Sequence, residues 1–109
     1  MTTGIEFYFD PTRKGIQIFL GPAQARLMEI AWRHGYITTR MARHQTGGGS
    51  ELSYSFVKSV LEILRKKGLL KKKKLGRLFS YSPTIERNRF IRERVLTIEK
   101  CLKTNFGKI

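Results

Sequence analysis

Residues 52–83 read LSYSFVKSVLEILRKKGLLKKKKLGRLFSYSP, and the architecture of the chain can be worked out from this stretch. Ser53 is suited to cap a helix over 54–67, because its side-chain oxygen can accept a hydrogen bond from a backbone N–H of the first turn. Gly68 is a natural end for that helix. Its apolar residues recur at the spacing of one buried face, namely Val57, Val60, Leu61 and Leu64.

The second half of this stretch is typical of a β-hairpin with a cationic arm. Residues 69–75 include four consecutive lysines, Gly76 lies near the expected tip, and residues 77–82 form the returning strand. From Lys58 to Arg77 there are nine basic residues and one acid, a net charge of +8. A solvated face that only keeps the protein soluble is one interpretation. Because adjacent lysines repel one another, we favour contact with phosphates.

Two shorter helices are predicted upstream. Pro22 suits the first position of a helix, and Gly35 suits its end. The apolar residues between them recur at helical spacing: Leu27, Met28, Ala31 and Trp32. Thr38 can cap a short helix that runs to Gln45. Residues 47–50, Gly-Gly-Gly-Ser, then form a flexible linker.

Residues 5–20 predict an extra β-hairpin at the N-terminus. Apolar residues alternate with their neighbours in two runs, and residues 10–15, DPTRKG, supply turn chemistry between them. The two runs are Ile5, Phe7 and Phe9, and Ile16, Ile18 and Leu20.

Residues 83–109 predict a C-terminal helix with a narrow apolar seam. The seam consists of Ile91, Val95, Ile98 and Leu102. A lone amphipathic helix at the end of a domain needs a surface that covers its seam, and a second copy of the chain is the simplest one. The alternative is that the helix folds back on its own domain. We expect residues 84–109 to form a dimerisation helix.

The whole chain shares the cationic bias of the hairpin. It has 109 residues, with 22 Lys+Arg against 8 Asp+Glu, a formal net charge of +14 and a pI near 10.5. A chain of this length is expected to form one domain. Its charge favours a polyanionic partner, either nucleic acid or an anionic membrane surface. The membrane is the weaker of the two, because no predicted helix pairs a cationic face with a broad apolar one.

Several classes of protein are excluded. One cysteine and two histidines cannot build a tetrahedral zinc site or a disulfide framework. No apolar run is long enough to span a membrane, and the N-terminus lacks the features of a secretion signal. The eight acids are scattered and form no pair suited to metal binding or acid–base work. We expect a cytoplasmic, nucleoid-associated protein that is not an enzyme, with no cofactor, metal or small-molecule ligand.

Helix, short helix, longer helix and two-stranded hairpin is the order of elements in a winged helix-turn-helix. The predicted fold class is therefore α+β, mainly α, with a winged-helix DNA-binding domain over 1–83, which includes the extra N-terminal hairpin, and the C-terminal helix over 84–109. In this architecture the third helix enters the major groove and the hairpin, or wing, lies along a phosphate backbone. The face of the third helix opposite its buried stripe displays Ser55, Lys58, Ser59, Glu62 and Lys66.

Over residues 20–83 the chain resembles the penicillinase-repressor family, which includes the methicillin-resistance repressors. The matching pieces are LGPAQARLMEIAW with its closing tryptophan, the serine that opens the third helix, VLEILRKKGLL, and GRLFSYSP. The resemblance implies a homodimeric repressor on a palindromic operator, joined through its C-terminal helices. The chain departs from the family at Phe56, where a small polar residue is usual, and at Leu52, where tryptophan is common.

The resemblance also implies which residues face DNA. Carried over by position, they are Ser53, Ser55, Phe56, Lys58 and Ser59 on the helix and Lys73, Lys74 and Arg77 on the wing. Residue type and predicted position, apart from the resemblance, add five further candidates for DNA contact: Tyr54, Lys66, Lys72, Arg40 and Arg43. Core packing is the alternative for the two aromatic residues: we expect Tyr54 to be exposed, where it could contact a phosphate or a thymine methyl, and Phe56 to pack inward beside Val60.

These observations together predict a sequence-specific regulator of transcription that binds double-stranded DNA, a repressor acting as a homodimer. Two alternatives stay open at this point. One is an architectural or replication-associated DNA-binding protein of low sequence specificity. The other is an RNA-binding component of a ribonucleoprotein, against which the sequence offers only the lack of an RNP-type aromatic strand and of a GXXG loop.

Overall fold

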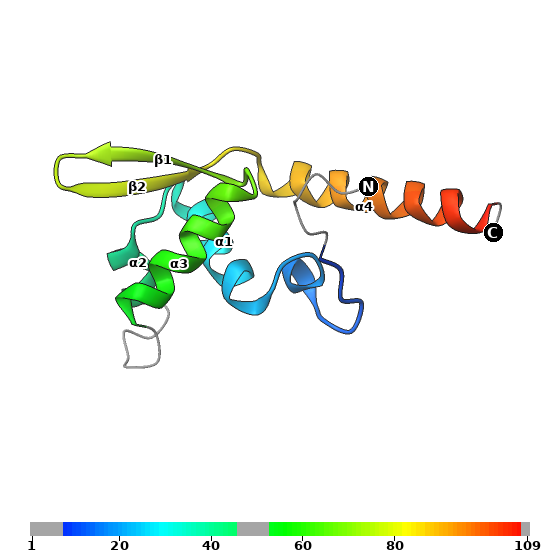
Figure 1. Ribbon diagram of the computed structural model, residues 1–109, viewed down its shortest axis with the longest axis horizontal. Coiled ribbons are helices and arrows are strands. Elements are labelled where there is room, and N and C mark those ends of the chain that lie inside the picture. Colours follow the sequence, from blue (N-terminus) through cyan, green and yellow to red (C-terminus); the bar gives the residue numbers. More distant parts are fainter. Residues whose placement is uncertain (1–7, 46–52, 108–109) are drawn as a thin grey trace.

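The computed structural model describes residues 8–45 and 53–107. Its elements follow one another as a short 3-10 helix η1 (Gly15–Ile18), α1 (Pro22–His34), α2 (Thr39–Gln45), α3 (Tyr54–Lys66), β1 (Leu70–Leu75), β2 (Leu78–Pro83) and α4 (Arg87–Phe106). Helices α1, α2 and α3 form the body of the molecule, from which the hairpin and α4 project at opposite ends (Figure 1). The predicted winged helix-turn-helix is confirmed.

The core lies between the three helices and the base of the hairpin. Helix α1 contributes Met28 and Ala31, both with no exposed surface, and α3 contributes Leu61 and Leu64, which are equally buried. Tyr81 of β2 is the largest of the fully buried side chains. The predicted stripe of α3 is therefore its buried face, and it holds α3 against α1 and the hairpin.

Local signals in the sequence set the ends of these helices. Gly35 has φ 86°, a left-handed conformation that glycine adopts without steric cost, and its N–H donates to Ala31 O (2.8 Å) at the end of α1. Thr38 Oγ1 accepts from Met41 N (3.1 Å), and Ser53 Oγ accepts from Phe56 N (3.1 Å). Both predicted caps are confirmed, and α3 ends at Lys66, one residue earlier than expected.

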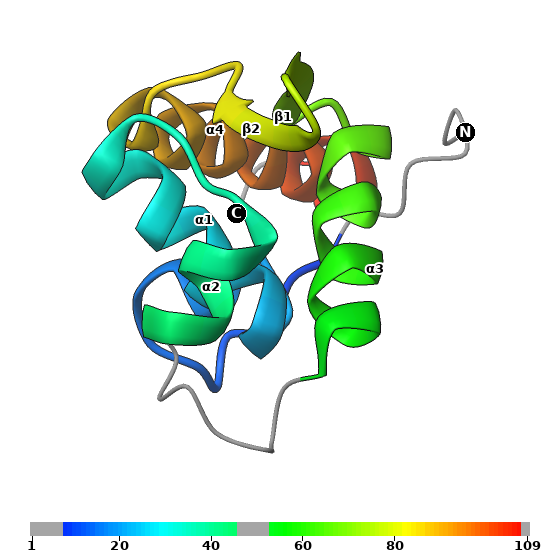
Figure 2. The same ribbon diagram turned by 90° about the vertical axis from the view of Figure 1, so that its left-hand side faces the viewer.

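The hairpin is antiparallel, with Lys72 opposite Tyr81 and Leu75 opposite Leu78. Gly76 makes the tight turn at its tip with φ 61°. At its base, Ile37 N donates to Tyr81 O (2.7 Å) and Tyr81 N donates to Ile37 O (2.9 Å). The segment between α1 and α2 is thereby joined to β2. Figure 2 shows α1 and α2 below the hairpin and α3 to the right of them.

The N-terminal hairpin expected over 5–20 is wrong in its second arm, where Gly15–Ile18 is a 3-10 helix. Ile16, Phe19 and Leu20 are the buried residues of this segment, a helical spacing rather than an alternating one. Phe19 turns inward because its ring packs edge-on against Phe90 of α4, 6.3 Å away. The part of the expected hairpin over 5–7 and the expected linker over 47–50 lie outside the described residues.

Helix α4 runs for 20 residues, a length of about 30 Å. Phe90 anchors its first turn in the core between Phe19 and Trp32, whose ring centroid lies 5.6 Å from that of Phe90. Beyond Phe90, the four residues of the predicted seam do not share one environment. Ile91 and Ile98 are partly buried against the domain, whereas Val95 and Leu102 are 47% and 41% exposed.

Replacing Ser53 by alanine removes the cap of α3, and we expect it to lower the free energy of unfolding by about 1 kcal/mol. Urea unfolding followed by circular dichroism measures the loss. Ser55→Ala, on the exposed face of the same helix, is the matched control and should change stability by less than about 0.5 kcal/mol. Equal effects of the two substitutions would contradict the role of Ser53.

Candidate nucleic-acid interface

The outer face of α3 is an open surface of small polar and cationic side chains. It carries a shallow depression, which is lined by Tyr54, Ser55, Lys58, Ser59, Glu62, Ile63 and Lys66. Every one of these residues except Glu62 is exposed, and five predicted contacts lie together on this face: Tyr54, Ser55, Lys58, Ser59 and Lys66. Serine hydroxyls and lysine amines can donate hydrogen bonds to base edges and to phosphates.

The wing adds further cations beside α3. Successive strand residues point to opposite faces, so Lys72 and Lys74 share a face with their partners Tyr81 and Phe79. Because the Tyr81 side chain reaches α3, this face is the one turned toward that helix. Arg77 follows the turn at Gly76 and is exposed at the tip.

Glu62 does not point out of the exposed face of α3 as its spacing suggested. Tyr81 Oη donates to Glu62 Oε2 (2.6 Å), and the Lys72 Nζ lies 3.0 Å from the same oxygen. Arg65 Nε donates to Glu62 Oε1 (2.9 Å). The carboxylate thus links α3 to both strands of the wing, and the predicted phosphate ligand Lys72 is held in an ion pair.

This arrangement changes the acidity of both partners. The Tyr81 hydrogen bond, helped by Lys72 and Arg65, lowers the pKa of Glu62 from 4.5 to about 2, against the opposing effect of desolvation. Burial, with the adjacent carboxylate, raises the pKa of Tyr81. The sequence carried no local signal for this contact, because the two residues lie 19 positions apart. The one hint was that Glu62 is the single acid between Lys58 and Arg77.

The two aromatic residues that begin α3 are both exposed. Tyr54 is 55% exposed and lies at the edge of the outer face. Phe56 is 46% exposed, so it does not pack into the core beside Val60 as expected. It lines a small recess with Ala23 and Leu27 of α1 instead. Arg40 and Arg43 lie exposed on α2, the helix that packs against α3.

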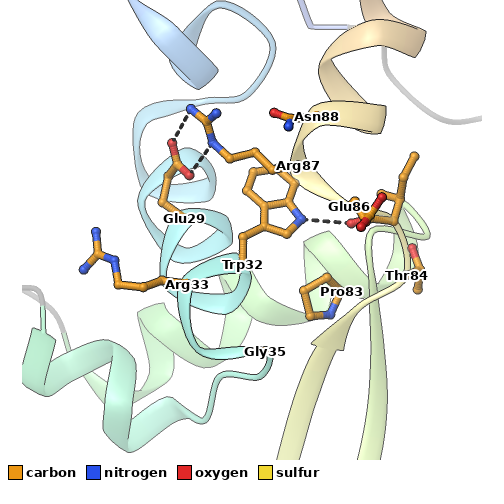
Figure 3. A pocket seen from close by; sticks show the side chains of 10 residues that line it. Glu29, Trp32, Arg33, Gly35, Pro83, Thr84, Glu86, Arg87 and Asn88 are labelled. Carbon is orange, nitrogen blue, oxygen red and sulfur yellow. Dashed lines mark hydrogen bonds and ion pairs between the residues drawn. The ribbon is translucent and has the colours of Figure 1, made fainter.

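A second hollow lies where α4 leaves the body, between the end of α1 and the segment that follows β2 (Figure 3). Arg87 donates two hydrogen bonds to the Glu29 carboxylate (2.8 and 3.1 Å), which raises the pKa of Arg87. Trp32 is half-buried, and its Nε1 donates to Ile85 O (2.9 Å). These contacts hold the base of α4 against α1.

Over 8–45 and 53–107, no three histidine, cysteine or acidic side chains gather in a way that could hold a metal ion. In the same residues, no helix has the length and apolar character needed to cross a bilayer.

Comparison with known proteins relates the chain to repressors. The sequence pattern of the penicillinase repressor family matches residues 20–107. The penicillinase repressor of Bacillus licheniformis is 31% identical over 72 residues, which is 66% of this chain and 56% of that protein. The chain therefore spans little more than half the length of this relative. The family is one of repressors and not of enzymes.

Two solved structures are similar to the chain. The DNA-binding domain of the repressor BlaI is 31% identical, with a TM-score of 0.54 over 68% of this chain and 89% of that one. The monomeric form of Bacillus licheniformis BlaI in complex with the blaP half-operator is 30% identical, with a TM-score of 0.52 over 63% of this chain and 84% of that one.

The lowered pKa of Glu62 predicts a pH-dependent contribution to stability. A carboxyl group whose pKa falls from 4.5 to about 2 on folding stabilises the fold above pH 4.5 and loses this effect as the pH falls toward 2. Because the carboxylate is partly exposed to solvent, we expect it to contribute about 1 kcal/mol to the free energy of unfolding at pH 7. Urea unfolding of the wild type and of Glu62→Gln should differ at pH 7 and converge below pH 3.

The lowered pKa of Asp10, which accepts hydrogen bonds from Thr12, affects both proteins alike and cancels in this comparison. A difference between wild type and variant that stays constant from pH 7 to pH 3 would contradict the assignment to Glu62.

Proposed function

The chain belongs to the penicillinase repressor family, and from this premise we propose that it is a transcriptional repressor that binds double-stranded DNA. The observation that carries the proposal is the position of the cationic wing beside the exposed polar face of α3. A 13-residue helix is about 20 Å long and fits the major groove. We propose that the protein acts in the cytoplasm, at the chromosome.

The proposed contacts divide by the chemistry of the side chains. Ser55, Lys58 and Ser59 lie at the centre of the outer face of α3, where they can read base edges. Lysine and arginine at the periphery neutralise phosphates, which positions the protein without selecting a sequence. These peripheral cations are Lys66, Lys73, Lys74, Arg77, Arg40 and Arg43. Ser53, Tyr54 and Phe56 lie at the N-terminal end of α3, the end that enters the groove first.

We further propose that two copies bind a palindromic operator. The Bacillus licheniformis repressor was solved as a monomeric form on a half-operator, and a half-operator is one half of a two-part site. The exposed residues Val95 and Leu102 are seven positions apart and share one side of α4. A second α4 packed on this side would cover both and join the two DNA-binding domains.

Selection of bound sites from a random duplex library, at near-physiological salt, tests the proposal directly. We expect an inverted repeat with one fixed spacing, because a two-fold dimer places two copies of α3 at a fixed separation. Enrichment of duplex without a sequence motif would favour an architectural protein of low specificity. Stronger binding to structured RNA than to duplex would favour the RNA-binding alternative. Either result would overturn the repressor proposal.

Substitutions of two lysines separate base reading from phosphate contact. Lys58→Ala should reduce the preference for the selected site by about 1–3 kcal/mol, because it removes a base-reading side chain. Lys74→Ala should weaken binding to all duplexes alike and make the slope of log K against log salt shallower by about 0.9. Fluorescence anisotropy across a salt series measures both quantities.

Lys100→Ala is the matched control, because it removes one exposed lysine from α4, the helix that projects from the end of the body opposite the wing (Figure 1). It should leave the site preference and the salt slope unchanged. If Lys58→Ala and Lys74→Ala weakened specific and random DNA by the same factor, the assignment of base reading to α3 would be wrong.

A charge placed on the exposed side of α4 tests the dimer. Val95→Glu should weaken self-association tenfold or more, because the carboxylate would be buried in an apolar contact without a partner. Sedimentation equilibrium, with and without the selected palindrome, measures the association. Thr97→Glu adds the same charge at a different side of the helix and serves as control. Equal association of the two variants would contradict a dimer through Val95.

A further inference from the structure

The position of Glu62 needs a physical reason if this surface binds a polyanion. It is the single acid among nine bases between Lys58 and Arg77, and it borders the outer face of α3. A free carboxylate there would repel phosphates and reduce the attraction of the neighbouring lysines. The reason lies in what the two oxygens of the carboxylate contact.

Both oxygens are occupied by partners from within the chain. Oε2 accepts from the Tyr81 hydroxyl and pairs with Lys72, and Oε1 pairs with the Arg65 guanidinium (Nη2 to Oε1 2.9 Å). The Glu62 side chain is only 24% exposed as a result. Its charge is therefore directed at the base of the wing and not at the groove that α3 would enter.

The partners of Glu62 are themselves fixed in place. Tyr81 is 1% exposed and its backbone exchanges two hydrogen bonds with Ile37, so its hydroxyl has a rigid support. Lys72 lies directly opposite Tyr81 in the sheet, and its amine sits 4.3 Å from the centroid of the Phe79 ring. One carboxylate of α3 thus reaches a side chain on each strand of the wing.

We infer that Glu62 is a positioning residue that fixes the wing relative to α3 and withholds Lys72 and Arg65 from phosphate contact. The inference rests on the proposed binding of DNA. It leaves phosphate contact to cations of α3 and the wing that have no ion-pair partner within the described residues, among them Lys66, Lys73, Lys74 and Arg77. Specific binding then relies on fewer charges and on a defined angle between helix and wing.

Two conservative substitutions separate these effects. In Glu62→Gln the amide oxygen can still accept from the Tyr81 hydroxyl, but the charge that holds Lys72 and Arg65 is lost. In Tyr81→Phe the ring stays in the core and the ion pairs remain, but the hydroxyl that ties β2 to α3 is lost. Glu99→Gln on α4 is the matched control for Glu62→Gln, because it adds the same net charge at an exposed position away from α3 and the wing.

The experiment measures binding of the full chain to its selected site and to random duplex across a salt series. For Glu62→Gln we expect the slope of log K against log salt to steepen by up to about 1.8, since two more cations can displace counterions. Binding to random duplex should rise, and the preference for the selected site should fall. Tyr81→Phe should lower the preference about tenfold and leave the slope unchanged. Glu99→Gln should change neither.

A purely structural role of Glu62 would leave the salt slope at its wild-type value, and that result would overturn the inference. An unchanged site preference in Tyr81→Phe would overturn the positioning of the wing through the hydroxyl. Urea unfolding of each variant, run in parallel, confirms that the protein measured is folded.

Failure of the proposed function can be told apart from failure of this inference. If the wild type binds no duplex, the proposed function fails. The release of cations is then read on immobilised heparin, a polyanion that needs no base reading. Glu62→Gln should elute at higher salt than Glu99→Gln although the two have equal net charge. Elution of both at the same salt would overturn the inference on its own.

Discussion

The arrangement of helix and wing depends on the burial of Tyr81. Its backbone pairs with Ile37, its ring is enclosed in the core, and its hydroxyl donates to Glu62. A buried hydroxyl without a partner would cost free energy, and a partly buried carboxylate would cost more. The hydroxyl and the carboxylate satisfy each other's hydrogen bonding, and the same hydrogen bond fixes the position of β2 relative to α3.

The contact between Glu62 and Tyr81 also bears on the high positive charge of the chain, which has both a favourable and an unfavourable effect. A net charge of +14 attracts a polyanion from a distance, but it also makes the folded domain repel itself and bind any duplex. Glu62 neutralises part of this charge where its carboxylate contacts both strands of the wing. Within the described residues of this region, cations without an ion-pair partner remain on the wing, as at Lys74 and Arg77, and on the open face of α3, as at Lys58 and Lys66.

The parts of the fold with local signals could be predicted from the sequence. Helix α3 has a cap, a periodic stripe and a glycine after its end, and each of these acts within a few residues. The segment before α1 offered alternating residues, but Phe19 turns inward to meet Phe90, 71 positions further on. The pairing of Glu62 with Tyr81 is also tertiary. Residue spacing predicted which face Glu62 lies on and could not predict where its carboxylate turns.

The contacts at the base of α4 set the direction of this helix in one chain, and this direction would set the separation of the two domains in a dimer. Two hydrogen bonds join Arg87 to the Glu29 carboxylate, and the Trp32 Nε1 donates to the Ile85 carbonyl. Phe90 is buried in the core next to Trp32. Three contacts of different kinds therefore fix the direction in which α4 leaves the body. In a dimer joined through the far half of α4, the same contacts would set the distance between the two copies of α3. The spacing of the two halves of an operator would then follow from residues that touch neither DNA nor the partner.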